Sequence, residues 1–149
     1  MRFIEYMDVG NRNHWRPELV VPSKELLARI AARWPLEPLR PHYRGEVADR
    51  YAFLDGQGEI GFISSVTQPF CGHCSRARLS SDGVFFTCLF ATQGTSLRDA
   101  LRAGMSDMEL TELIRSIWLR RSDRYSELRA SLRRSSGEQR KIEMYYIGG

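Results

Sequence analysis

The chain has 149 residues, of which 42% are apolar and 11% aromatic, which suits a globular protein with a core of its own. No apolar run approaches the length of a membrane span, and the opening residues lack the apolar centre and cleavage site of a signal peptide, so we expect a cytoplasmic protein with no membrane partner. In that compartment an odd number of cysteines, three, argues against a disulfide framework and favours metal or redox use.

The net charge of +4 is unevenly distributed along the chain. The segment from Arg115 to Lys141 contains nine basic residues and three acidic ones. Two interpretations stay open for this segment: a solvated helix and tail, or a surface that faces phosphates or nucleic acid.

The opening residues, Arg2 to Val9, are typical of a strand that is apolar on both faces, as in parallel sheets covered by helices. No second strand of this type and no crossover unit follows. We therefore expect one strand of a sheet whose other members are absent from this chain. A loop marked by Gly10 and Pro17 follows and contains His14.

A helix is predicted from Lys24 to Trp34, with Ser23 as its cap and Pro35 at its end. The prolines from 35 to 41 predict an extended connector. Two strands, 48–54 and 59–64, then flank the turn residues 55–58 as a hairpin.

The second half begins with another predicted hairpin, 77–80 and 84–88. Ser96 or Thr95 with Asp99 indicates a short helix, and Ser106 with Glu109 indicates a capping box for a longer one. An apolar run precedes the terminal Gly148 and Gly149, which predicts a strand-like, docked end.

All three cysteines lie around this second hairpin, in the spacing C-x2-C-x13-C: Cys71, Cys74 and Cys88. The hairpin predicts that Cys88 returns towards the other two, and three thiolates would hold a soft metal with one coordination position left open.

Three alternatives remain for these thiols. An iron-sulfur cluster on three cysteines leaves one iron open to a substrate nitrogen or oxygen. Zinc prefers a fourth ligand; His73 is poorly placed for it, and His14 or His42 would serve only if the fold brings them in. The cysteines could also be unligated core residues.

Arg76 and Arg78 follow the cysteine turn directly. On a strand, residues two apart share a face, where two guanidinium groups could bind phosphate in a bidentate manner. The chain has 20 arginines and two lysines, so ordinary surface arginine is the competing interpretation.

Five stretches together resemble the carboxy-terminal half of the GTP 3',8-cyclase family, radical S-adenosylmethionine enzymes that begin molybdenum-cofactor synthesis. They are RFIEYMDVGN (2–11), GFISSVTQPFCGHCSRARL (61–79), TCLFA (87–91), DRY (123–125) and MYYIGG (144–149). The resemblance runs almost end to end.

The resemblance implies roles for particular residues. The cysteines would hold a [4Fe-4S] cluster whose open iron binds the guanine of GTP, and Arg76 and Arg78 would contact GTP. Arg2 would reach the triphosphate, Met7 would lie beside S-adenosylmethionine, and Gly148 with Gly149 would enter the active site. Tyr145, where the family commonly has a smaller residue, is a minor departure.

One departure is large, because the C-x3-C-x2-C motif of the radical-generating cluster is absent. We therefore expect a fragment, a truncated product or half of a split enzyme, inactive alone. Its N-terminal half could be on another chain, and a homodimer is possible. The predicted class is α+β: the last strand of an incomplete radical-enzyme barrel (1–45), then an iron-sulfur, GTP-binding domain of hairpins and helices (46–149).

Two other functions stay open. One is a zinc-stapled nucleic-acid-binding module that uses the basic segment. The other is an auxiliary cluster domain of a radical enzyme that acts on peptides. The arginine pair and the terminal glycines favour the cyclase, for which no nucleic-acid partner is expected.

Overall fold

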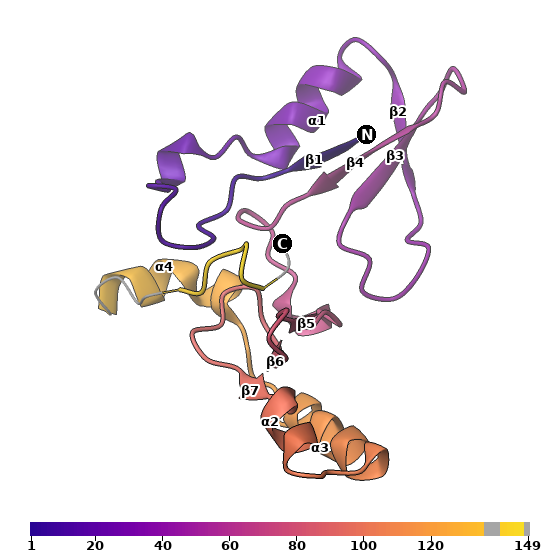
Figure 1. Cartoon of the computed structure of the whole chain (residues 1–149). Helices are drawn as coiled ribbons and strands as arrows, with labels where there is room; N and C mark the ends of the chain where they lie inside the picture. Colours follow the sequence, from indigo (N-terminus) through magenta and orange to yellow (C-terminus); the bar gives the residue numbers. More distant parts are fainter. Residues whose placement is uncertain (136–140, 148–149) are drawn as a thin grey trace. The chain divides into compact units, whose positions relative to one another are not determined.

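A computed structural model describes residues 1–135 and 141–147 of the chain. The chain divides into two compact units, one made of Met1–Asp8 with His14–Cys74 and the other of Val9–Asn13 with Ser75–Gly149. Each unit has its own sheet, and the mixture of helices with largely antiparallel sheets confirms the predicted α+β class (Figure 1). The predicted domains, 1–45 and 46–149, refer to the complete family fold and stay a prediction.

The first unit is built on a four-stranded sheet in the order β1-β4-β3-β2 (Figure 1). β1 runs parallel to β4, and the other neighbours are antiparallel. The strands are β1 (Arg2–Ile4), β2 (Leu36–Leu39), β3 (Asp49–Phe53) and β4 (Glu59–Ile63).

The opening strand differs from its prediction in two ways. We expected a strand without neighbours in this chain, and this was wrong, because β1 pairs with β4 and Phe3 lies opposite Phe62. The strand is also shorter than predicted. It is not buried on both faces, since Ile4 is 58% exposed. A run of apolar residues does not reveal a parallel partner that lies far along the chain.

Phe62 is the centre of this unit's core and is 2% exposed. The Phe3 ring stacks on it with the ring centroids 5.4 Å apart, and Tyr51 meets it edge-on at 5.8 Å. The hairpin of β3 and β4 confirms the prediction, and its turn contains Gly56 at φ +74°. Packing of β1, β3 and β4 side chains on one ring therefore joins these strands into a single layer.

The helix predicted at 24–34 is α1, Ser23–Ala31, preceded by a 3-10 turn, Pro17–Leu19. Ser23 does not cap it: Pro22 is the N-cap residue, and Ser23 is the first helical residue. The expected connector is also partly wrong, since Leu36–Leu39 forms β2, at the edge of the sheet, where Pro38 is tolerated.

The second unit has a three-stranded antiparallel sheet in the order β5-β6-β7, followed by three helices. α2 contacts both β6 and α3. The elements are β5 (Arg78–Leu79), β6 (Val84–Phe86), β7 (Thr95–Ser96), α2 (Leu97–Arg102), α3 (Asp107–Leu119) and α4 (Tyr125–Ser135). β5 and β6 confirm the second predicted hairpin, although both strands are shorter than expected.

Both predicted helix starts in this unit are confirmed. The Ser96 side chain accepts a hydrogen bond from the Asp99 backbone N–H at the start of α2. Ser106 and Glu109 form a complete capping box at the start of α3. These motifs are local, so the residues that form them are sufficient to predict them.

The carboxy-terminal segment is a turn rather than the expected strand. Backbone hydrogen bonds run from Tyr146 N to Glu143 O and from Ile147 N to Met144 O. Ile147 is 1% exposed, which confirms a docked end up to this residue. Gly148 and Gly149 lie outside the described residues. No helix in the described part of the chain combines the length and apolarity that a membrane crossing requires.

Candidate functional site

Cys71 and Cys74 lie at the two ends of one tight turn in the first unit, as predicted. The 3-10 helix η2 spans Cys71–His73, and the Cys74 backbone N–H donates to the Cys71 carbonyl at 3.2 Å. Both cysteines are half-buried, and neither is in a disulfide. Two thiols are thus held on one short stretch of backbone.

The chain that leads into this turn is anchored on a buried carboxylate, Glu5, which is 4% exposed. One carboxylate oxygen of Glu5 accepts the backbone N–H groups of Val66 and Thr67, both at 2.8 Å. The other oxygen accepts the Ser23 N–H at 2.8 Å and the Thr67 hydroxyl at 2.6 Å. Glu5 therefore ties β1, the start of α1 and the segment before the cysteine turn to one point.

Burial alone would raise the pKa of Glu5, but the hydrogen bonds from Thr67, Ser23 and Val66 outweigh it and lower this pKa below its ordinary value. The residue therefore stays ionised inside the unit. Sequence reasoning missed this anchor. The signal was a carboxylate between Ile4 and Tyr6 in a mostly apolar run, a position where a charge requires partners.

Cys88 lies in the second unit, just beyond β6, and two contacts fix its backbone there. The Thr87 hydroxyl donates to Asp123 at 2.6 Å, before the start of α4. The Phe90 backbone N–H donates to the Cys88 sulfur at 3.4 Å. Hydrogen bonds of this kind to ligand sulfurs are typical of iron-sulfur sites.

The Phe90 side chain continues this support. Its ring stacks on Tyr125 with centroids 4.4 Å apart. The Arg129 guanidinium lies over the Phe90 ring at 5.4 Å, and the Lys141 ammonium lies over the Tyr125 ring at 4.9 Å. The DRY stretch at 123–125 thus holds the Cys88 loop through both its carboxylate and its aromatic ring.

Each of the three thiols has the chemistry and the partial burial of a soft-metal ligand, and Cys88 also accepts a hydrogen bond. Cys71 and Cys74 belong to one unit and Cys88 to the other. Among the residues that the structure describes, no group of three His, Cys, Asp or Glu side chains that could hold a metal ion is found. The return of Cys88 towards Cys71 and Cys74 stays a prediction. The cluster and zinc alternatives therefore both stay predictions.

Arg76 and Arg78 are placed differently from each other. Arg78 is half-buried in β5, opposite Phe86, whereas Arg76 is exposed in the extended residues before the strand. We predicted that both arginines lie on one face of a strand. β5 begins at Arg78 and does not include Arg76, so this strand does not place the two side chains on a common face. Met7 is half-buried in the segment after β1.

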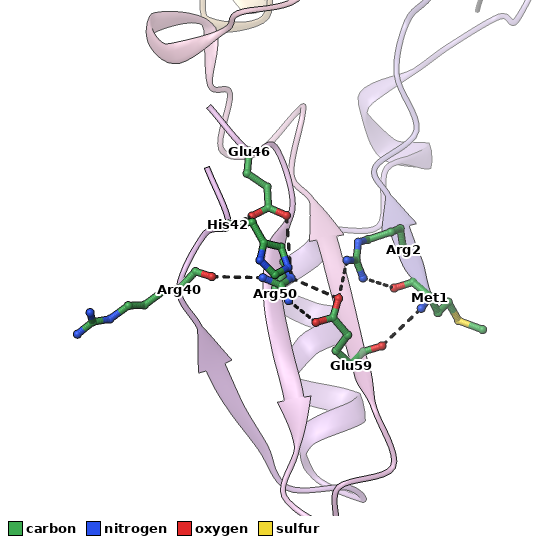
Figure 2. Close-up of polar contacts among 7 residues, drawn as sticks. All are labelled: Met1, Arg2, Arg40, His42, Glu46, Arg50 and Glu59. Carbon is green, nitrogen blue, oxygen red and sulfur yellow. Dashed lines mark hydrogen bonds and ion pairs between the residues drawn. The ribbon is translucent and has the colours of Figure 1, made fainter. Parts of the chain in front are cut away.

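Arg2 is engaged in an ion-pair network within the first unit (Figure 2). Its guanidinium donates to Glu59 at 2.6 Å and to the Met1 carbonyl at 3.2 Å. Arg50, 8% exposed, binds the same carboxylate from the other side. Arg50 also lies 4.0 Å from the Glu46 carboxylate. Glu59 thus joins β1, β3 and β4 by charge.

Replacing Glu59 with Gln should reduce stability most at neutral pH. Hydrogen bonds from Arg50 and then Arg2 hold the pKa of Glu59 at about 2, below its ordinary value of 4.5. Because the folded-state pKa is the lower one, the stabilisation is present above pH 4.5 and is lost as the pH falls through about 2. Urea unfolding of both proteins from pH 2 to pH 7 checks this: the difference between them should grow as the pH rises. A difference independent of pH would contradict it.

The described side chains of the basic segment are engaged within the second unit. Arg115 pairs with Glu112, Arg121 with Asp123 and Arg124 with Glu127. Arg129 and Lys141 lie over aromatic rings. These contacts are compatible with a solvated helix, and the nucleic-acid alternative stays a prediction.

Comparison with known proteins agrees with the resemblance of the motifs. The sequence model of the family described as Molybdenum Cofactor Synthesis C matches residues 1–127. The GTP 3',8-cyclase of Xanthomonas campestris pv. campestris (strain B100) is 56% identical over 149 residues, which cover 100% of this chain and 42% of that protein. The GTP 3',8-cyclases of Acidothermus cellulolyticus and Synechococcus sp. (strain CC9605) are both 51% identical and cover the whole chain.

The chain spans 47% of the length of the Acidothermus protein and 41% of the Synechococcus protein, so less than half of each. The family match covers the β1 strand, the cysteine turn, the arginines that follow it and Cys88. The chain belongs to the Molybdenum Cofactor Synthesis C family and is similar to the carboxy-terminal part of GTP 3',8-cyclases.

Proposed function

We propose that this chain forms the substrate-holding part of a GTP 3',8-cyclase, which makes the 3',8-cyclised nucleotide in molybdenum cofactor synthesis. The observation that carries the proposal is the match over the whole chain to proteins of that name, at 56% identity for one of them. The match includes the three cysteines and the arginines that follow the first two of them.

Cys71, Cys74 and Cys88 would hold the [4Fe-4S] cluster. When bound by three thiolates, such a cluster offers one iron position to a nitrogen or oxygen of guanine. The tight turn of η2 would fix two of the ligands, with Glu5 holding the backbone before it. Asp123 and Tyr125 would fix the loop of the third.

The phosphates of GTP would be bound by arginine side chains. Arg76 is exposed and Arg78 is half-buried, so both have side-chain surface that a ligand can reach. Arg2 is the third candidate, and its side chain is 37% exposed beside Glu59. Because Glu59 is also bound by Arg50, the carboxylate would keep a partner if Arg2 turned to a phosphate.

S-adenosylmethionine cleavage would require a second cluster, which three cysteines cannot provide in addition to the first. We propose that this step belongs to a radical-enzyme half, on the same polypeptide or on a partner chain. Met7 would lie on the S-adenosylmethionine side, and Gly148 with Gly149 would complete the active site.

Arg76→Ala and Arg78→Ala should each weaken GTP binding by the reconstituted chain about tenfold to hundredfold, the worth of one charge-assisted hydrogen bond or two. Guanosine, which has no phosphates, should lose little affinity. Arg102→Ala, an exposed arginine in the last turn of α2, is the matched control and should bind GTP normally. An equal loss of GTP affinity in all three variants would mean that only the net charge of the chain matters. That result would contradict specific phosphate contacts.

A further inference from the structure

The Asn11 side chain binds the backbone of the carboxy-terminal segment in both directions. Its amide nitrogen donates to the Lys141 carbonyl at 2.6 Å, and its carbonyl oxygen accepts the Lys141 N–H at 2.8 Å. A side-chain amide thus takes the place that a neighbouring strand would have. Both residues belong to the second unit, because this unit includes Val9–Asn13.

Glu143 completes the contact from the other side. Its carboxylate accepts from the Asn11 backbone N–H at 3.1 Å and from the Asn11 side-chain amide at 2.9 Å. Gly10 has φ +66°, and a Cβ there would lie 2.3 Å from the Glu143 carboxylate. The positive φ favours glycine beside Asn11, and a side chain there would also push the Glu143 carboxylate away from Asn11.

The far end of the same segment is fixed by other contacts. The Tyr146 hydroxyl donates to Asp82 at 2.8 Å, and the Tyr146 ring meets Phe86 edge-on at 6.2 Å. Ile147 is almost fully buried. The segment 141–147 is thus held at both ends, and Gly148 follows directly in the sequence.

We propose that Asn11 is a positioning residue for the carboxy-terminal glycines, acting through Lys141 and Glu143. The proposal rests on the function proposed above, in which Gly148 and Gly149 work in the active site. Glycine has no side chain that could make such contacts, and the segment directly before the two glycines supplies them instead. Asn11 couples that segment to the chain that follows Met7.

Hydrogen exchange of the reconstituted chain tests this proposal. Asn11→Ala should speed amide exchange in residues 141–149 about tenfold or more, because the three hydrogen bonds of the Asn11 side chain are lost. GTP affinity, measured on the same samples, should stay within about twofold. Arg12→Ala, at the exposed neighbouring position, is the control and should exchange like the wild type.

A charge-based rescue separates specific positioning from general destabilisation. Asn11→Asp replaces the amide donor by an acceptor facing Glu143, so exchange should also speed up. Adding Glu143→Gln supplies a new donor to Asp at position 11 and should restore part of the protection, because the Lys141 carbonyl still lacks its donor. Unchanged exchange in Asn11→Ala, or no rescue by Glu143→Gln, would overturn the role of Asn11. Failure of the wild type to bind GTP would instead overturn the proposed function, and the exchange result would still stand by itself.

Discussion

Cys88→Ser is expected to abolish assembly of the [4Fe-4S] cluster, although Cys88 is far in sequence from the other two cysteines. The wild-type chain, reconstituted anaerobically with iron and sulfide, should hold about four irons, and the variant should hold almost none. Cys71→Ser and Cys74→Ser should give the same result, because a three-cysteine site has no ligand to spare. Iron and sulfide analysis with absorption spectra measures the loss.

His73→Ala is the matched control for the cysteine variants. His73 lies in the same turn, between Cys71 and Cys74, and is exposed. If the cysteines are the ligands, the His73 variant should keep its iron. Loss of metal in this variant, or retention of the cluster in Cys88→Ser, would contradict the proposed ligand set. Circular dichroism of each variant shows whether the fold is kept.

Glu5→Gln is expected to cost about 3 kcal/mol of folding free energy, a large effect for an isosteric change. The new amide group would face the N–H donors of Val66, Thr67 or Ser23, which now point at a carboxylate. Urea unfolding at neutral pH measures the loss. The matched control is Glu25→Gln in α1, where an exposed ion pair with Arg29 should contribute about 0.3–0.5 kcal/mol.

The effect of Glu5→Gln should depend on pH. Because the folded-state pKa of Glu5 lies below its ordinary value of 4.5, its stabilisation is present above that pH and is lost as the pH falls through the lower, folded-state value. The two proteins should therefore converge in acid. Equal stability at neutral pH, or a gap that persists in strong acid, would contradict an ionised anchor.

The same substitution should also weaken the proposed cluster site. Residues 64–68 connect Glu5's hydrogen-bond donors to the cysteine turn, and the Gln68 N–H donates to the Ser64 carbonyl at 3.0 Å. Loosening this stretch should make the cluster easier to remove by a chelator. The rate of iron loss, compared with Glu25→Gln, measures this.

The parts of the fold that depend on neighbouring residues could be predicted from the sequence. The Ser106–Glu109 capping box is one such part, because both partners lie within one turn. The two hairpins are others, since Gly56 and Gly83 adopt positive φ in their turns. The paired thiols of the turn at 71–74 were predicted for the same reason.

The errors arose where distant residues decide the structure. Serine is a common N-cap residue, but the Ser23 backbone N–H donates to Glu5, and Pro22 is the N-cap residue. The ion pair of Arg2 with Glu59 was not predicted, because no local pattern shows that Glu59 lies against it; the role of Arg2 towards the triphosphate stays a prediction. The pairing of β1 with β4 joins residues almost 60 positions apart, a distance over which periodicity carries no information.

The residues of the candidate site were predicted from residue type and spacing. The contacts that hold these residues in place were not predicted. Cys88 has its place because Thr87 and Phe90 contact Asp123 and Tyr125, which lie more than 30 residues further on. Asn11 holds the tail across 130 residues. Such contacts become visible only in the folded chain, although all of these residues except Lys141 lie in stretches that resemble the family.

The central claim is that GTP binds at a cluster held by this chain, and one titration tests it most directly. The reconstituted chain is reduced anaerobically, and its electron paramagnetic resonance spectrum is recorded as GTP is added, with ATP as the control nucleotide. The claim predicts about four irons per chain and a saturable change of the cluster spectrum with GTP but not with ATP. A colourless chain that takes up one zinc instead, or a cluster whose spectrum GTP does not change, would contradict it.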